Sequence, residues 1–130
     1  MTIGPIDTLL EADPLTLSAD MPIRRAAAQM AEADCAAAPV TDDSGTLVGV
    51  LTQKDCFRPA LQASYYQEWT GQVGDFMSTD PVTLPLGTDL VSAAEAFLEH
   101  PYRSFPVLDG DRLAGMLRRE DVFRTLIKAG

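Results

Sequence analysis

Two short stretches of the sequence place an aspartate three residues after a polar side chain. Thr52 precedes Asp55 in one stretch, and Arg118 precedes Asp121 in the other. Each pair ends an apolar run that carries a glycine and opens an amphipathic segment, as at a strand-to-helix junction. Backbone N–H groups and the helix dipole attract anions there. A hydroxyl can contact a phosphate, and a carboxylate can accept both hydroxyls of a ribose. The pattern therefore predicts ligand binding and lacks the parts of a catalytic site.

A purely structural interpretation of these residues stays open beside that one. Asp55 and Asp121 could be first-turn helix aspartates, each stabilised by the helix dipole by about 0.3–1 kcal/mol. Thr52 would then be a helix N-cap. The last helix would carry a basic face that pairs with nearby carboxylates, formed by Arg118, Arg119, Arg124 and Lys128.

Composition narrows the classes of partner. The chain of 130 residues carries a formal charge of −9, which argues against nucleic acid because phosphate backbones attract basic surfaces. No run approaches the roughly 20 apolar residues of a membrane span, and Met1 to Pro5 contains no charged leader. We therefore expect a cytoplasmic protein with no membrane segment.

The residues that build metal and redox centres are scarce. Cys35 and Cys56 are widely spaced, and we expect both to be reduced, with Cys35 partly buried. The single histidine, His100, cannot build a zinc site. With no Walker loop or nucleophile–base pair in the sequence, we expect neither an enzyme nor a required cofactor.

The chain contains one unit twice. Asp13 to Leu17 returns 67 residues later as Asp80 to Leu84, and the same offset relates the alanine-rich segments and the two Pro-Val pairs. One residue is lost in the following turn. Beyond it, matching residues continue to the end of both copies: Leu47, Gly49, Leu51, Asp55, Phe57 and Arg58 match Leu113, Gly115, Leu117, Asp121, Phe123 and Arg124.

Each copy is predicted to form a strand, a helix, two strands and a second helix. The first strands are expected at 15–17 and 82–84. The second strands are expected to start at the two Pro-Val pairs, and the third strands to run over 47–51 and 113–117. Asp20 and Thr88 are the candidate caps of the first helices, with Pro22 in a first turn. One apolar face is expected on each of these helices, from Ile23, Ala26, Ala27 and Met30 and from Leu90, Ala93, Ala94 and Phe97.

The second helices differ between the copies. We expect a continuous helix over 119–128, but a kink or restart at Pro59 in the first copy. The join over 59–72 carries Tyr65, Tyr66 and Trp69. We expect their rings to pack on the core, although packing on a partner chain or over a ligand stays open.

In this order, and twice, these features resemble a tandem pair of CBS domains, the module named after cystathionine β-synthase. They are the Val73 to Met77 lead-in, the Asp-Pro-x-Thr strand, the alanine-rich helix, the Pro-Val strand start, the acidic turn and the Gly-x-x-Thr-x-x-Asp ending. The resemblance implies an α/β (α+β) fold of two βαββα units in a pseudo-two-fold Bateman-type module. It places the units at 6–58 and 73–127, with a linker over 59–72, and implies a disc-shaped homodimer.

The resemblance also implies ligands and their sites. Family ligands contain adenosine: AMP, ADP, ATP and S-adenosylmethionine. In a first cleft between the units, the resemblance places Thr52, Lys54, Asp55, Asp80, Val82, Arg103, Ser104 and Phe105, with Asp55 on the ribose and Arg103 near phosphate. A second cleft would take Arg118, Asp121, Asp13, Ala37 and Ala38. There Arg118 stands where the family usually has Thr or Ser, and could supply phosphate charge or fill the cleft.

The leading hypothesis is a stand-alone regulatory module that senses an adenosine nucleotide and signals by a conformational change of a homodimer. The alternative is a ligand-free module that dimerises or docks on a partner enzyme or transporter, using Tyr65, Tyr66 and Trp69. In either case a protein partner in trans is required.

Overall fold

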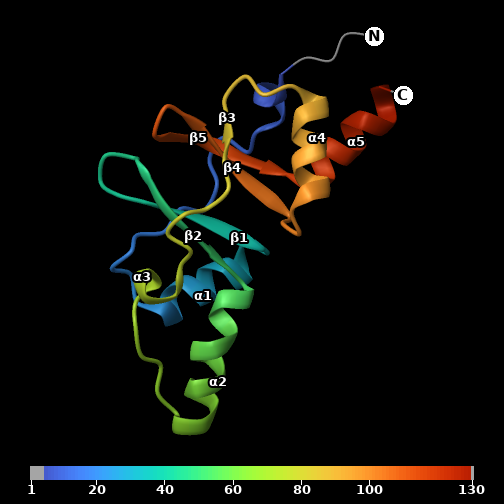
Figure 1. The fold of residues 1–130 in the computed structure, drawn as a ribbon. Helices are drawn as coiled ribbons and strands as arrows, with labels where there is room; N and C mark the ends of the chain where they lie inside the picture. The colour runs from blue at the N-terminus through green and yellow to red at the C-terminus, as the bar shows by residue number, and fades with distance from the viewer. Residues whose placement is uncertain (1–4, 130) are drawn as a thin grey trace. The chain divides into compact units, whose positions relative to one another are not determined.

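The computed structural model describes residues 5–129, so the leader region considered above lies almost wholly outside the described part. The chain divides into two compact units (Figure 1). We call Leu15–Pro81 the central unit. The terminal unit consists of the N-terminal residues up to Pro14 together with the chain from Val82 onward.

The central unit is a β-hairpin with helices. Its elements are α1 (Ile23–Glu32), β1 (Ala37–Thr41), β2 (Leu47–Thr52), the 3-10 turn η2 (Lys54–Cys56), α2 (Phe57–Tyr66) and α3 (Val73–Phe76). β1 and β2 are antiparallel, with Ala37 opposite Thr52. The hairpin is widened on both sides, because Leu17 forms a parallel bridge to Val40 and Ser78 an antiparallel bridge to Val50.

The terminal unit repeats this plan. Its elements are the 3-10 turn η1 (Ile6–Leu9), β3 (Leu84–Pro85), α4 (Leu90–Glu99), β4 (Ser104–Asp109), β5 (Arg112–Arg118) and α5 (Arg119–Ala129). β3 is parallel to β4, and β4 is antiparallel to β5. Glu11 bridges Met116 on the far side of β5, as Ser78 bridges Val50 in the central unit. Helices α4 and α5 pack side by side (Figure 1).

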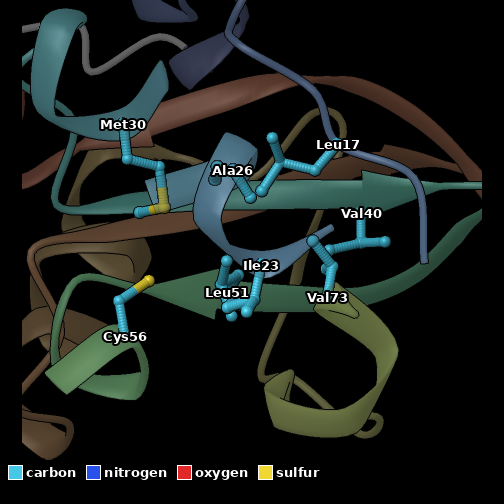
Figure 2. Close-up of a cluster of buried hydrophobic side chains, with 9 residues drawn as sticks. Leu17, Ile23, Ala26, Met30, Val40, Leu51, Cys56 and Val73 are labelled. Atoms are coloured by element: carbon cyan, nitrogen blue, oxygen red, sulfur yellow. The ribbon is translucent and has the colours of Figure 1, made fainter. Parts of the chain in front are cut away.

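Both units have the apolar helix face that the sequence predicts. Ile23, Ala26 and Met30 of α1 are buried in one cluster with Leu51 of β2 (Figure 2), and Ala27 packs against this cluster. In the terminal unit Leu90 and Ala93 of α4 are buried with Val107 and Leu117, while Ala94 and Phe97 pack on them.

The two lead-in segments exchange places between the repeats. Val73 of α3, at the start of the second sequence repeat, is fully buried in the central unit, in the cluster shown in Figure 2. Ile6 of η1, at the start of the first repeat, is fully buried in the terminal unit. The compact units are therefore not the same stretches of chain as the sequence repeats.

The first strands and the helix caps differ from the sequence prediction. The first strand of the central unit is reduced to the single bridge at Leu17, and that of the terminal unit to Leu84–Pro85. Helix α4 is capped by Asp89, whose carboxylate accepts from Ser92 N at 2.7 Å. Thr88 is not the cap, because its hydroxyl donates to the carbonyl of Pro85.

The first backbone N–H of α1 is hydrogen-bonded by a residue far away in the sequence. Asp20 is not its cap, and Pro22 is the N-cap residue directly before the helix and makes no side-chain capping bond. The first N–H of α1, that of Ile23, donates to the carbonyl of Gly71 at 3.0 Å. A distant carbonyl therefore does what a capping side chain usually does.

Helix α2 is the element that departs most from its repeat partner. It begins at Phe57 after η2, so Pro59 lies in its first turn, where the ring is tolerated. It packs less closely on α1 than α5 packs on α4. Trp69 packs against the core as expected, but the prediction for Tyr65 and Tyr66 was wrong, because these side chains are 82% and 78% exposed.

Candidate functional site

Thr52 and Asp55 are joined by two reciprocal hydrogen bonds at the end of β2. The Thr52 N–H donates to Oδ2 of Asp55 at 2.9 Å, and the Asp55 N–H donates to Oγ1 of Thr52 at 3.1 Å. These two bonds have the reciprocal geometry of a capping box, so both residues stabilise the start of the helical segment. It leaves Oδ1 of Asp55 without a partner among residues 5–129.

Two alanines lie across the hairpin from the end of β2 that carries Thr52. Ala37 lies opposite Thr52 in the hairpin, and the Gln53 N–H donates to the carbonyl of Ala36 at 2.9 Å. Lys54 is exposed, and Asp55 is half-buried. Asp55 is therefore an anionic group at a junction whose neighbours across the hairpin are alanines.

The equivalent junction of the terminal unit is crowded with arginines. Ser104 lies opposite Arg118, and the Arg119 N–H donates to the carbonyl of Arg103 at 2.8 Å. These contacts repeat those of Ala37 with Thr52 and of Gln53 with Ala36. The two junctions thus share these two contacts and differ in charge.

Asp121 is enclosed by two of the terminal unit's arginines. Nε of Arg118 donates to Oδ2 of Asp121 at 2.9 Å, and a guanidinium nitrogen of Arg124 lies 3.6 Å from Oδ1. Glu120 extends the cluster, at 3.5 Å from Arg118 and 3.7 Å from Arg124. The hydrogen bond that Arg118 donates to Asp121 raises the pKa of Arg118, so this guanidinium stays charged. The expected pairing of the basic helix face with carboxylates is confirmed for Arg118 and Arg124.

Two of the predicted site residues have side chains inside the core. Phe105 is fully buried and packs among the rings of Phe97, His100 and Tyr102. Ala38 is fully buried in the central cluster. These two residues can offer a ligand only their main chain.

The remaining predicted residues are more accessible and are divided between the units. Asp80 lies in the central unit; Asp13, Val82 and Arg103 lie in the terminal unit. Asp13, Asp80 and Arg103 are exposed, and Val82 is half-buried. Their grouping with Asp55 or Asp121 into two clefts stays a prediction.

Two features of the junctions were not predicted as part of a site. Arg124 contacts Asp121, which its spacing of three residues on a helix could have indicated. Cys56, directly after Asp55, is buried, and burial together with the Asp55 charge raises the pKa of its thiol. Its place in the core could not be read from the sequence.

The described residues offer little for other chemistries. No three metal-ligating side chains of His, Cys, Asp or Glu gather among residues 5–129. Within the same range, every helix is too short or too polar to cross a bilayer.

Matches to the CBS domain family cover residues 6–60 and 73–128. This chain therefore belongs to the CBS domain family, and its mixed α/β structure is that of a CBS pair. It is 29% identical over 116 residues to the chloroplastic CBS domain-containing protein CBSX2 of Arabidopsis thaliana, covering 69% of this chain and 49% of that protein.

A crystal structure of CBSX2 in complex with AMP matches the fold with a TM-score of 0.83 and 27% identity, covering 96% of this chain and 97% of that one. Other relatives are longer. Protein MJ1225 of Methanocaldococcus jannaschii is 23% identical over 94% of this chain, and inosine-5'-monophosphate dehydrogenase of Aquifex aeolicus is 25% identical over 86% of it. The chain spans only 42% and 22% of their lengths.

Proposed function

We propose that this chain is a regulatory CBS pair that binds an adenosine-containing nucleotide through Asp55. The carrying observation is the junction at the end of β2, where Thr52 holds the Asp55 carboxylate by one oxygen and leaves Oδ1 available. An ionised carboxylate accepts hydrogen bonds at both oxygens, which suits the adjacent hydroxyls of a ribose. The similarity to CBSX2, which was crystallised with AMP, supports this ligand class.

Regulation would follow from differential binding. A nucleotide shifts the conformation of the module only to the extent that it binds one conformation more tightly than another. In this proposal the signal passes to a protein partner in trans. A cytoplasmic location and a homodimer belong to the same proposal.

The test is isothermal titration calorimetry of nucleotide-free protein with AMP, followed by ADP, ATP and S-adenosylmethionine. We expect one site per chain that Asp55→Ala abolishes. Asp55→Ala also removes a capping box, so Asp75→Ala is the matched control: Oδ2 of Asp75 accepts from Gln72 N at 2.9 Å in the capping box of α3. Asp75→Ala should bind AMP as wild type does. Full binding by Asp55→Ala, or none by wild type with any of the four, would refute the proposal.

A second candidate function is favoured by the exposed apolar side chains of α2 and α5. Phe57 and Leu61 are 64% and 57% exposed on α2, and the repeat-equivalent Phe123 and Ile127 are 62% and 65% exposed on α5. Spacing of four residues places each pair on one helix face. Exposed apolar patches mark interaction surfaces. These two pairs support an interaction module that needs no ligand, and a second copy of the chain is the occupant we propose.

Light scattering tests this second candidate. We expect a dimer that becomes monomeric in Phe57→Ser/Leu61→Ser or in Phe123→Ser/Ile127→Ser. The control is Leu98→Ser, at a position 88% exposed on α4. A dimer that persists in both double variants would show that these faces do not form the interface.

A further inference from the structure

The aspartate carboxylates of the two strand-to-helix junctions have different partners. The carboxylate of Asp55 receives one backbone N–H and keeps its second oxygen available. The carboxylate of Asp121 has a guanidinium at each oxygen, Arg118 at Oδ2 and Arg124 at Oδ1. The side chain of Asp121 is only 21% exposed. The strand pairing and the backbone hydrogen bond across each junction are the same, so the difference around the two carboxylates comes from the side chains at positions 52 and 118.

Arg118 is the side chain that creates most of it. It stands at the position of Thr52, so the hydroxyl that accepts from the backbone N–H of the aspartate is missing. Nε of Arg118 donates to Oδ2 of Asp121, whereas Oδ2 of Asp55 accepts from the backbone N–H of Thr52. A guanidinium that donates a charge-assisted hydrogen bond to a carboxylate competes directly with any ribose hydroxyl for the same lone pairs. A carboxylate oxygen of Glu120 also lies 3.5 Å from the same guanidinium.

We propose that Arg118 closes the Asp121 junction to ribose, so that the chain has one working nucleotide site where its repeat would provide two. The inference rests on the proposed function for the identity of the ligand. In this proposal, Arg118 sets the number of nucleotides bound per chain. The alternative interpretation is that Arg118 contacts a phosphate group of the ligand. The two interpretations predict effects of opposite sign when the guanidinium is removed.

The experiment measures AMP binding in the Asp55→Ala background, in which the first junction should no longer bind nucleotide. Asp55→Ala should bind no AMP. Asp55→Ala/Arg118→Thr should gain one AMP site per chain where the parent Asp55→Ala has none. Adding Asp121→Ala should abolish it. Asp55→Ala/Arg119→Thr is the matched control, with the same change of charge at an exposed neighbour that forms no ion pair among the described residues.

The converse substitution tests the same idea in the intact junction. Thr52→Arg should close the Asp55 site, whereas Thr52→Val, which removes the hydroxyl without adding a guanidinium, should weaken AMP binding less. Thermal unfolding of each variant identifies any that fail to fold, and the two directions of substitution do not depend on each other.

Each outcome of these experiments supports or contradicts the role of Arg118. If Asp55→Ala already binds AMP and Arg118→Thr abolishes that binding, Arg118 is a phosphate ligand and the inference is wrong. If Asp55→Ala/Arg118→Thr folds but gains no site, the inference also fails, while one AMP per wild-type chain still supports the proposed function. If wild type binds no AMP but Arg118→Thr gains an Asp121-dependent site, the proposed function fails and the inference stands.

Discussion

The main chain of Ser78 exchanges two hydrogen bonds with that of Val50, at 2.9 and 3.0 Å. Glu11 and Met116 make the same exchange in the terminal unit, at 2.9 and 3.1 Å. The segment that leads into each sequence repeat thus pairs with the edge of the sheet formed by the other repeat. Because backbone atoms make these bonds, side-chain patterns do not reveal them.

The glycines of the two repeated strands are explained by this crossing. A Cβ atom on Gly49 would lie 2.6 Å from the carbonyl oxygen of Ser78, and one on Gly115 would lie 2.7 Å from that of Glu11. We predict that Gly49→Ala and Gly115→Ala each lower the free energy of unfolding by at least about 2 kcal/mol, the scale of an overpacked core. Urea unfolding measures this loss.

Gly87→Ala is the comparison for these variants. A Cβ there meets nothing within 4 Å, but φ is +88°. The expected loss is therefore the backbone strain alone, about 1 kcal/mol. Equal losses at all three glycines would show that the close approach of the crossing segment carries no cost.

Ile6 should stabilise the terminal unit although it begins the first sequence repeat. Its side chain is fully buried with Leu90, Val107 and Leu117. Ile6→Ala should cost about 2–5 kcal/mol, as for other large-to-small core substitutions. Hydrogen exchange locates the effect: protection should fall first in α4, β4 and β5. Preferential loss in α1 and β1 would contradict the exchange of lead-in segments.

The thiol of Cys56 should be unreactive at neutral pH. Burial raises its pKa above the ordinary value of 9.0, and the neighbouring Asp55 charge raises it further. In a Cys35→Ser background, the rate of alkylation by iodoacetamide should still be rising above pH 9.0. Asp55→Ala should move this profile to lower pH. A profile that levels off below pH 9.0 would contradict the prediction.

Asp89 should give an acid-dependent contribution to stability. The N–H of Ser92 lowers the pKa of Asp89 below 3.8 in the folded chain, since it stabilises the ionised cap. The contribution is therefore present above pH 3.8 and disappears as pH falls through the lowered folded-state pKa. The difference in stability between wild type and Asp89→Ala should shrink over that range. Thr88→Val, which removes the residue first expected to be the cap, should leave this pH dependence intact.

Much of the fold was predictable because the information is local. The repeat of 67 residues, the apolar faces of α1 and α4 and the Pro-Val strand starts follow from spacing along one element. The Thr52–Asp55 pair could be identified because its two hydrogen bonds span only three residues. Spacing on one helix likewise allowed the pairing of Arg124 with an acidic neighbour to be anticipated.

Tertiary structure decided which segments bury which surfaces. Ile6 and Val73 are apolar in either unit, and only the crossing of the chain places each in the core of the other repeat. Tyr65 and Tyr66 are large aromatic residues of a kind often found in a core. They are exposed here because α2 makes few contacts with α1. The sequence by itself determined the two repeats and the aspartate three residues after Thr52 and after Arg118. The structure decided that Asp55 keeps an oxygen available and that arginines enclose Asp121, because that depends on where long side chains meet in space.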